Sequence, residues 1–143
     1  MPEVEDQLET EPSNEVYRAA AELRTALRTF SRRSEQLARE QGMTPQQYLL
    51  LLLIKGAPDG SERATVTDLA RRLQLGQSTV TELVQRAEEA GLIERSPDRS
   101  DARVSWLSLT EDGSNRLAAV TVKLGPERRR LAELLAALQA DLD

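Results

Sequence analysis

Two short predicted helices separated by a glycine, followed by two strand-like runs, place the strongest limit on how this chain can fold. Residues 64–95 read ATVTDLARRLQLGQSTVTELVQRAEEAGLIER. Apolar residues recur at helical spacing on both sides of the break at Leu75-Gly76, and Thr67 is the expected cap of the first helix. Gly91 ends the second helix, which we place at about residues 77–90. Two short helices joined in this way form a helix-turn-helix unit.

A predicted hairpin follows directly. Leu92–Arg95 and Val104–Leu109 favour strands, and the loop between them carries Asp98, Arg99, Asp101 and Arg103. A helix-turn-helix followed by a hairpin is a winged helix, and the charged loop is then the tip of the wing. The single tryptophan, Trp106, lies on the second strand, where packing of the hairpin or contact with a ligand would each explain it.

Helices are predicted on both sides of this unit. One covers about residues 14–41, with Asn14 as the expected cap, and another starts at Thr44-Pro45 and contains QYLLLLLIK, which we expect to be buried all round. A third runs from Thr110 to about Leu124, and a last helix carries a leucine stripe to Leu142. The predicted fold is mainly α with a small antiparallel β-wing. We predict an acidic, disordered tail at residues 1–13 and a single domain at 14–143, with the winged helix at about 64–110. The outer helices, about 14–41 and 111–143, have apolar stripes without an obvious partner and are the expected dimerisation helices.

Composition excludes several kinds of chemistry. The chain has no cysteine and no histidine, which removes thiol chemistry, disulfides, the commonest general base and the commonest metal ligand. No catalytic residue, metal site or cofactor is therefore predicted, and the sequence does not favour an enzyme. The longest apolar run, Tyr48–Ile54, is too short to cross a membrane, and no signal pattern precedes it. We expect a cytoplasmic protein.

The net charge of −5 gives a misleading first impression about nucleic acid. Six of the acidic residues fall within the first 15 residues, which hold no lysine or arginine, so the rest of the chain carries 18 acids and 19 bases. Of the 19 basic residues, 17 are arginine, whose guanidinium group suits phosphates and guanine edges.

The second helix of the helix-turn-helix presents a polar face that suits a DNA major groove. With Val80, Leu83, Val84 and Ala87 turned to the core, the residues left outward are Gln77, Ser78, Thr79, Thr81, Glu82, Gln85 and Arg86. Short polar side chains of this kind can contact base edges, and the helix N-terminus can bind a phosphate. An ordinary solvated helix face would also have this pattern. For Arg86, a phosphate contact and an ion pair inside the domain both stay open.

The motifs together resemble the MarR family of bacterial transcriptional regulators. The matching elements are Leu69-Ala70, STVT at 78–81, AGLIER at 90–95, DRSDAR at 98–103 and Leu109-Thr110, and the flanking helices match in order. The resemblance implies a homodimer that binds a pseudo-palindromic site on double-stranded DNA, more often as a repressor than as an activator. It also implies that the arginine of Asp101-Ala102-Arg103 enters a minor groove. We expect Asp101 to tighten the turn and to set the direction of this arginine, while a flexible loop with screened ion pairs is the alternative.

The resemblance further implies release by a small aromatic or anionic effector, and helical phase places Arg24, Phe30, Tyr48 and Leu52 near its site. Plain core packing of Phe30 and Tyr48 with a solvated Arg24 would also explain these residues. The chain departs from the family pattern at Gly76, where a capping serine is common, and at Glu82, where a basic residue is common. Residues 65–110 hold 6 arginines and 7 acids, so a winged helix that contacts protein without specific DNA binding is the alternative.

Overall fold

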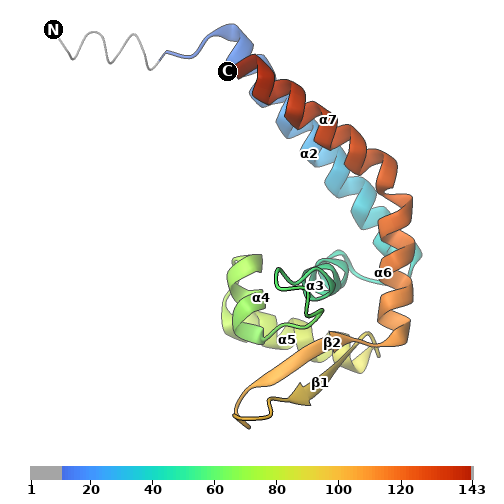
Figure 1. Cartoon of the computed structure of the whole chain (residues 1–143). Helices are drawn as coiled ribbons and strands as arrows, with labels where there is room; N and C mark the ends of the chain where they lie inside the picture. The colour runs from blue at the N-terminus through green and yellow to red at the C-terminus, as the bar shows by residue number, and fades with distance from the viewer. Residues whose placement is uncertain (1–10, 143) are drawn as a thin grey trace, which may run out of the picture. The chain divides into compact units, whose positions relative to one another are not determined.

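The computed structural model describes residues 11–142, and most of the predicted acidic tail therefore lies outside the described residues. The elements in chain order are α2 (Asn14–Glu40), α3 (Pro45–Lys55), α4 (Val66–Leu73), α5 (Gln77–Glu89), β1 (Ile93–Pro97), β2 (Ser105–Leu109), α6 (Glu111–Lys123) and α7 (Gly125–Leu142). This confirms the predicted fold class, mainly helical with one small antiparallel sheet (Figure 1). None of the described helices is long and apolar enough to cross a membrane.

The described chain divides into two compact units, one formed by residues 11–33 and 124–142 and the other by residues 34–123. In the first unit, α7 lies alongside the N-terminal part of α2, and Arg33 Nε lies 3.7 Å from a carboxylate oxygen of Glu127 (Figure 1). Phe30 of α2 and Leu131 of α7 line the same groove. The grouping of residues 14–143 into a single domain stays a prediction.

The starts of three helices show how local side-chain chemistry sets their ends. Thr44 accepts a hydrogen bond from the Gln47 N–H, and the Gln47 side chain accepts one from the Thr44 N–H, so the predicted start of α3 is confirmed as a capping box. For α4, the predicted cap was wrong by two residues, because Thr65 rather than Thr67 accepts from the Asp68 N–H. At α2, Ser13 accepts from the Val16 N–H, so Asn14 is the first helical residue and not the cap.

The expectation that α3 is buried all round was wrong. Tyr48, Leu50, Leu51 and Ile54 are buried, whereas Leu49 is 44% exposed. The neighbours of α3 are α4, α5, α6 and β2, and in one small unit they cover only part of an 11-residue helix. Because residues 49–53 are all leucine, the sequence does not indicate which side of the helix stays uncovered.

The second unit is built around the helix-turn-helix and the hairpin. Val80, Val84 and Ala87 are fully buried on the inner side of α5, and the fourth predicted core residue, Leu83, is half-buried. Gln74 adopts the left-handed conformation between α4 and α5 (φ 58°), and Gly91 does so after α5 (φ 76°), as its predicted position requires. The two breaks therefore occur where the sequence predicts them.

β1 and β2 form an antiparallel pair with Ile93 opposite Leu109 and Pro97 opposite Ser105. Each strand begins one residue later than predicted, and β1 continues to Pro97. Leu107 is fully buried and forms an isolated bridge with Ala64, so the segment before α4 lies against β2. In the view of Figure 1 the hairpin extends past α5 and ends in the charged loop.

Candidate nucleic-acid interface

The outer face of α5 brings together all seven residues predicted on it. Gln77, Ser78, Thr79, Thr81, Glu82, Gln85 and Arg86 are exposed. Ser78, Glu82 and Gln85 lie on the side opposite Val80 and Val84, because one residue turns an α-helix by about 100°. This side is polar and carries a carboxylate near its centre.

The N-terminus of α5 has no side-chain cap. Gly76 occupies the capping position without a side-chain hydrogen bond, so the N–H groups of the first turn lack that acceptor. Because glycine stands at position 76, where a capping serine is common in the family, these N–H groups can donate to another acceptor. Backbone N–H groups at a helix N-terminus bind phosphate oxygens well.

Two of the predicted contact residues already have partners inside the unit. Gln77 Nε2 donates to Thr67 Oγ1 at 3.1 Å, which connects the two helices of the helix-turn-helix. Thr81 Oγ1 donates to the carbonyl oxygen of Gln77 at 2.8 Å. Ser78, Thr79 and Gln85 have no such contact within the described chain, so their side chains can turn toward a partner molecule.

The surroundings of Arg86 decide between its two interpretations, a phosphate contact and an ion pair inside the domain. Arg86 is exposed, and in the described part of the chain it forms no ion pair, although Glu82 lies one turn away. The interpretation that Arg86 holds the helix in place through an internal carboxylate was therefore wrong. Arg95 of β1 has that role instead, because its Nε lies 2.6 Å from Glu88 of α5.

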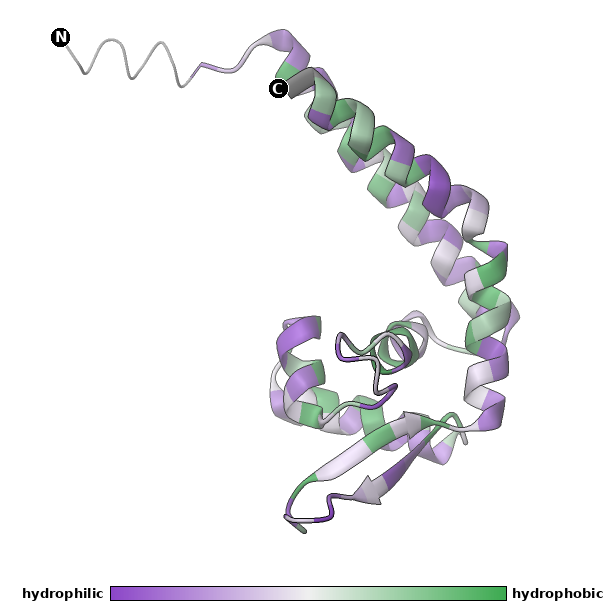
Figure 2. Ribbon diagram, in the orientation of Figure 1, coloured by the Kyte–Doolittle hydropathy of each residue, from purple (hydrophilic) through white to green (hydrophobic). Residues whose placement is uncertain are grey.

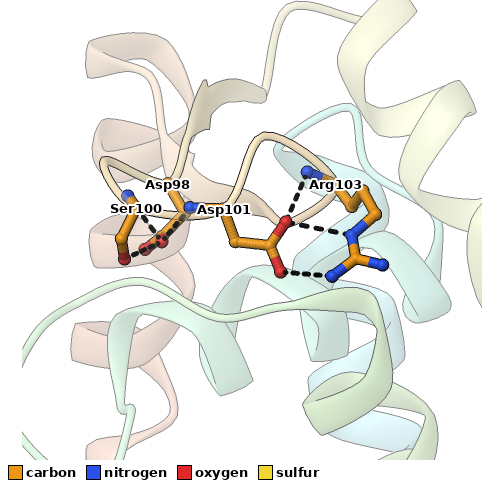
Figure 3. Close-up of polar contacts among 4 residues, drawn as sticks. All are labelled: Asp98, Ser100, Asp101 and Arg103. Atoms are coloured by element: carbon orange, nitrogen blue, oxygen red, sulfur yellow. Dashed lines mark hydrogen bonds and ion pairs between the residues drawn. The ribbon is translucent and has the colours of Figure 1, made fainter.

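The tip of the wing is an ordered turn built on Asp101. Its Oδ1 accepts hydrogen bonds from the Arg103 N–H at 3.0 Å and from Arg103 Nε at 3.1 Å, and its Oδ2 lies 3.4 Å from the Arg103 guanidinium (Figure 3). As predicted, Asp101 tightens the turn and sets the direction of the Arg103 side chain. These bonds hold the pKa of Asp101 below its usual range.

Arg103 is a highly exposed cation of this turn. Its side chain is 90% exposed, while that of Asp101 is 39% exposed. Arg99 is also exposed and forms no ion pair with the described residues. The turn therefore presents two guanidinium groups to solvent, and one of them has its direction set by a carboxylate.

Asp98 is a structural residue that sequence analysis did not identify. Its Oδ2 accepts from the N–H and hydroxyl of Ser100 and from the Asp101 N–H, at 2.9–3.1 Å (Figure 3). Its Oδ1 accepts from the indole N–H of Trp106 at 2.9 Å. The Trp106 bond and the Ser100 bonds lower the pKa of Asp98 to about 2. A carboxylate with a lowered pKa stabilises the folded turn above the unfolded pKa of 3.8, and this contribution is lost as the pH falls through about 2.

Trp106 packs on the unit as the simpler of its two interpretations predicts. The Arg63 guanidinium lies 4.0 Å from the centre of the indole ring, a cation–π contact, and the tryptophan is half-buried. The position of Trp106 on the second strand of the hairpin, opposite Ser96, agrees with a packing role. The sequence does not indicate its contact with Arg63, because the two residues are 43 positions apart.

Of the four residues predicted near an effector, Arg24 and Phe30 belong to the first unit and Tyr48 and Leu52 to the second, so their grouping stays a prediction. Phe30 lines a groove of about 500 Å³ between α2 and α7, but Arg24 does not line it, and the arginine there is Arg130. Tyr48 is buried in the core of the second unit, and Leu52 is 36% exposed. Within the described residues, no cluster of carboxylates could hold a metal ion.

Comparison with known proteins matches this geometry to a family. Residues 41–104, which include α3, the helix-turn-helix and most of the wing, match the model of the MarR family. Across these residues the chain is similar to the MarR family. The Asp-Ala-Arg turn at Asp101 and the polar face of α5 are thus parts of a MarR-type winged helix.

Two curated MarR-type relatives come from Bacillus subtilis. The organic hydroperoxide resistance transcriptional regulator is 34% identical over 87 residues, 61% of this chain and 56% of the relative. The transcriptional repressor MdtR is 36% identical over 81 residues, 57% of this chain and 50% of the relative. The matched part thus spans about half the length of these relatives. Their regulator names agree with the expectation that the chain is not an enzyme.

Solved structures share the fold. A mutant of MarR from E. coli, complexed with operator DNA, has a TM-score of 0.67 and 20% identity, covering 93% of this chain and 96% of that one. A likeness at this identity establishes the winged-helix architecture with its flanking helices, and the fold prediction is confirmed.

Proposed function

We propose that this chain is a sequence-specific DNA-binding transcriptional regulator that acts as a homodimer on a pseudo-palindromic operator. One observation carries the proposal. At the tip of a hairpin, the Arg103 side chain is 90% exposed and is held in direction by Asp101. An exposed guanidinium that is oriented in advance loses less conformational entropy when it binds an anion than a free one does.

The two elements suit two different grooves. The polar face of α5 fits a major groove, where Gln85 can contact adenine and Glu82 can accept a hydrogen bond from cytosine. The uncapped first turn after Gly76 can bind a backbone phosphate. Arg103 of the wing fits a narrow A·T-rich minor groove, where negative potential is concentrated.

Repression is the proposed mode, since a dimer on its operator blocks other proteins from that DNA, and the related MdtR is named a repressor. Release by a small aromatic or anionic ligand is a secondary proposal. The apolar groove of Phe30, Leu131 and Leu134 supports it as a place for an aromatic ring, and the charged groups that line it are Arg130, Glu22 and Glu127.

Selection of bound sequences from a random pool of DNA duplexes tests the proposed function. The full chain should enrich a short inverted repeat, with A·T pairs at the flanks where the wings would lie. No enrichment at low salt would refute DNA recognition. The alternative, a winged helix that contacts protein, would then be favoured by the near balance of charges in the winged helix.

We expect the protein to be a dimer at micromolar concentration in analytical ultracentrifugation. In the first unit Val16 is 38% exposed, Tyr17 56%, Leu27 40% and Leu135 46%, which leaves apolar surface on both helices. Figure 2 shows hydrophobic segments along both α2 and α7. A second copy would cover them and would set the two recognition helices about 34 Å apart, one turn of DNA. A stable monomer that binds the full operator would contradict this prediction.

Removing Asp101 should weaken operator binding even though the change removes a negative charge from the interface. Asp101→Ala deletes the acceptor of the Arg103 N–H and the partner of its guanidinium, so the turn loses its shape. We expect an affinity loss of about three- to tenfold, as for a group that orders its neighbour. Fluorescence anisotropy of labelled operator measures it, and tighter binding by the variant would show that charge outweighs turn geometry.

A further inference from the structure

We propose that Asp98 is a positioning residue that couples the turn carrying Arg103 to Trp106 and thereby to the body of the winged helix. The inference rests on the proposed function, because it concerns how the wing is presented to DNA. It assigns a role to three residues outside the predicted contact set, namely Asp98, Trp106 and Arg63.

The two carboxylate oxygens of Asp98 have separate partners. Oδ2 accepts all three bonds from the start of the turn, at Ser100 and Asp101. Oδ1 accepts the indole N–H of Trp106 on β2. An ionised carboxylate accepts on both oxygens, whereas an asparagine would direct an N–H₂ group at one of these two sets of donors. The side chain is therefore a bridge between the turn and the strand.

The far end of this bridge is tied to the rest of the unit. The ring of Trp106 is covered by Arg63. The residues that follow these two, Ala64 and Leu107, exchange two backbone hydrogen bonds at 2.8 and 3.0 Å. Ala64 and Leu107 are both buried. The segment before α4 thus holds β2 at the level of Trp106, and Asp98 extends this attachment to the wing tip.

The turn needs such an attachment because its own ion pair is exposed. An exposed pair like Asp101–Arg103 contributes about 0–1 kcal/mol. The loop closes on itself through two backbone bonds, from the Asp98 N–H to Val104 O and from the Val104 N–H to Asp101 O, each 3.0 Å. These bonds shape the loop, and among the described residues the Asp98 side chain alone bonds to the indole ring.

A double-mutant cycle tests the coupling. Asp98→Ala removes both sets of bonds, and Trp106→Phe keeps a ring for Arg63 while removing the N–H donor. Each single change should weaken binding to the selected operator about three- to tenfold, and the double variant should bind no more weakly than Asp98→Ala alone. If the two effects multiply, or if Trp106→Phe binds like the parent, the coupling is refuted.

The matched control is Asp59→Ala. Asp59 also accepts from a backbone N–H two residues on, Ser61 at 3.0 Å, and its pKa is lowered, but its turn is not part of the wing. The control removes the same charge and the same kind of turn bond, so operator affinity should stay within twofold of the parent. A loss equal to that of Asp98→Ala would assign the effect to net charge or to general turn stability and would overturn the inference.

A measurement without DNA separates this inference from the proposed function. Backbone NMR order parameters for residues 99–103 should be near those of rigid backbone, about 0.8, in the parent and should fall below about 0.6 in both single variants. Loss of order in Trp106→Phe, whose change lies on β2, would support the coupling even if no DNA sequence is enriched. Unchanged order parameters in that variant would overturn the coupling even if the parent binds DNA.

Discussion

Arg103→Ala should lower the affinity for the selected operator by about 1–3 kcal/mol, roughly five- to 150-fold, and should reduce the salt dependence of binding by about one counterion. The guanidinium lies on an ordered turn, where the Arg103 side chain is 90% exposed and Asp101 sets its direction. Its removal therefore deletes a contact without changing the core of the unit. Fluorescence anisotropy over a series of salt concentrations gives both the affinity and its salt dependence. The dimer and the melting temperature of the variant should be those of the parent.

The control for this prediction is Lys123→Ala, which removes one positive charge at the far end of α6. Lys123 is exposed, and it lies 12 residues along the helix from Glu111, about 18 Å from the base of the wing. Its loss should change affinity only through net charge, by less than twofold at physiological salt. If Arg103→Ala binds like the parent at that salt, the wing is not a DNA contact.

Gly113→Ala should destabilise the fold by about 1–3 kcal/mol, although alanine is the better helix former by about 1 kcal/mol. Gly113 is buried in the first turn of α6, where an added Cβ would lie 2.1 Å from the carbonyl oxygen of Leu92. That oxygen belongs to the backbone and also accepts the Thr110 N–H at 3.1 Å. Neither side can move without disturbing the junction between the hairpin and α6.

Thermal unfolding followed by circular dichroism checks this prediction, and the melting temperature should fall by several degrees. Gly125→Ala is the matched control, because the Cβ there would meet only the ends of flexible arginine side chains, at 3.4 Å or more. It should unfold near the parent temperature. A rise in melting temperature for Gly113→Ala would show that helix propensity outweighs the close contact.

The candidate site was predictable to the extent that it depends on local spacing. The outward face of α5 follows from a helical period that buries Val80 and Val84, and the turn at Asp101 follows from the habit of aspartate to bond N–H groups two residues on. The internal contacts of the site were not predictable. Gln77 reaches Thr67 across the break between helices, and Arg63 reaches Trp106 across 43 residues.

By itself the sequence determined the order of the helices, their breaks near Gly76 and Gly91, and the hairpin with a charged tip, because apolar period, caps and glycine conformation act over a few neighbouring residues. Only the tertiary structure decided which leucines of α3 are covered, why Gly113 must lack a side chain, and that Asp98 ties the wing to Trp106. These features depend on which surfaces pack together. The residues in contact are separated along the chain, so a local sequence pattern does not indicate them.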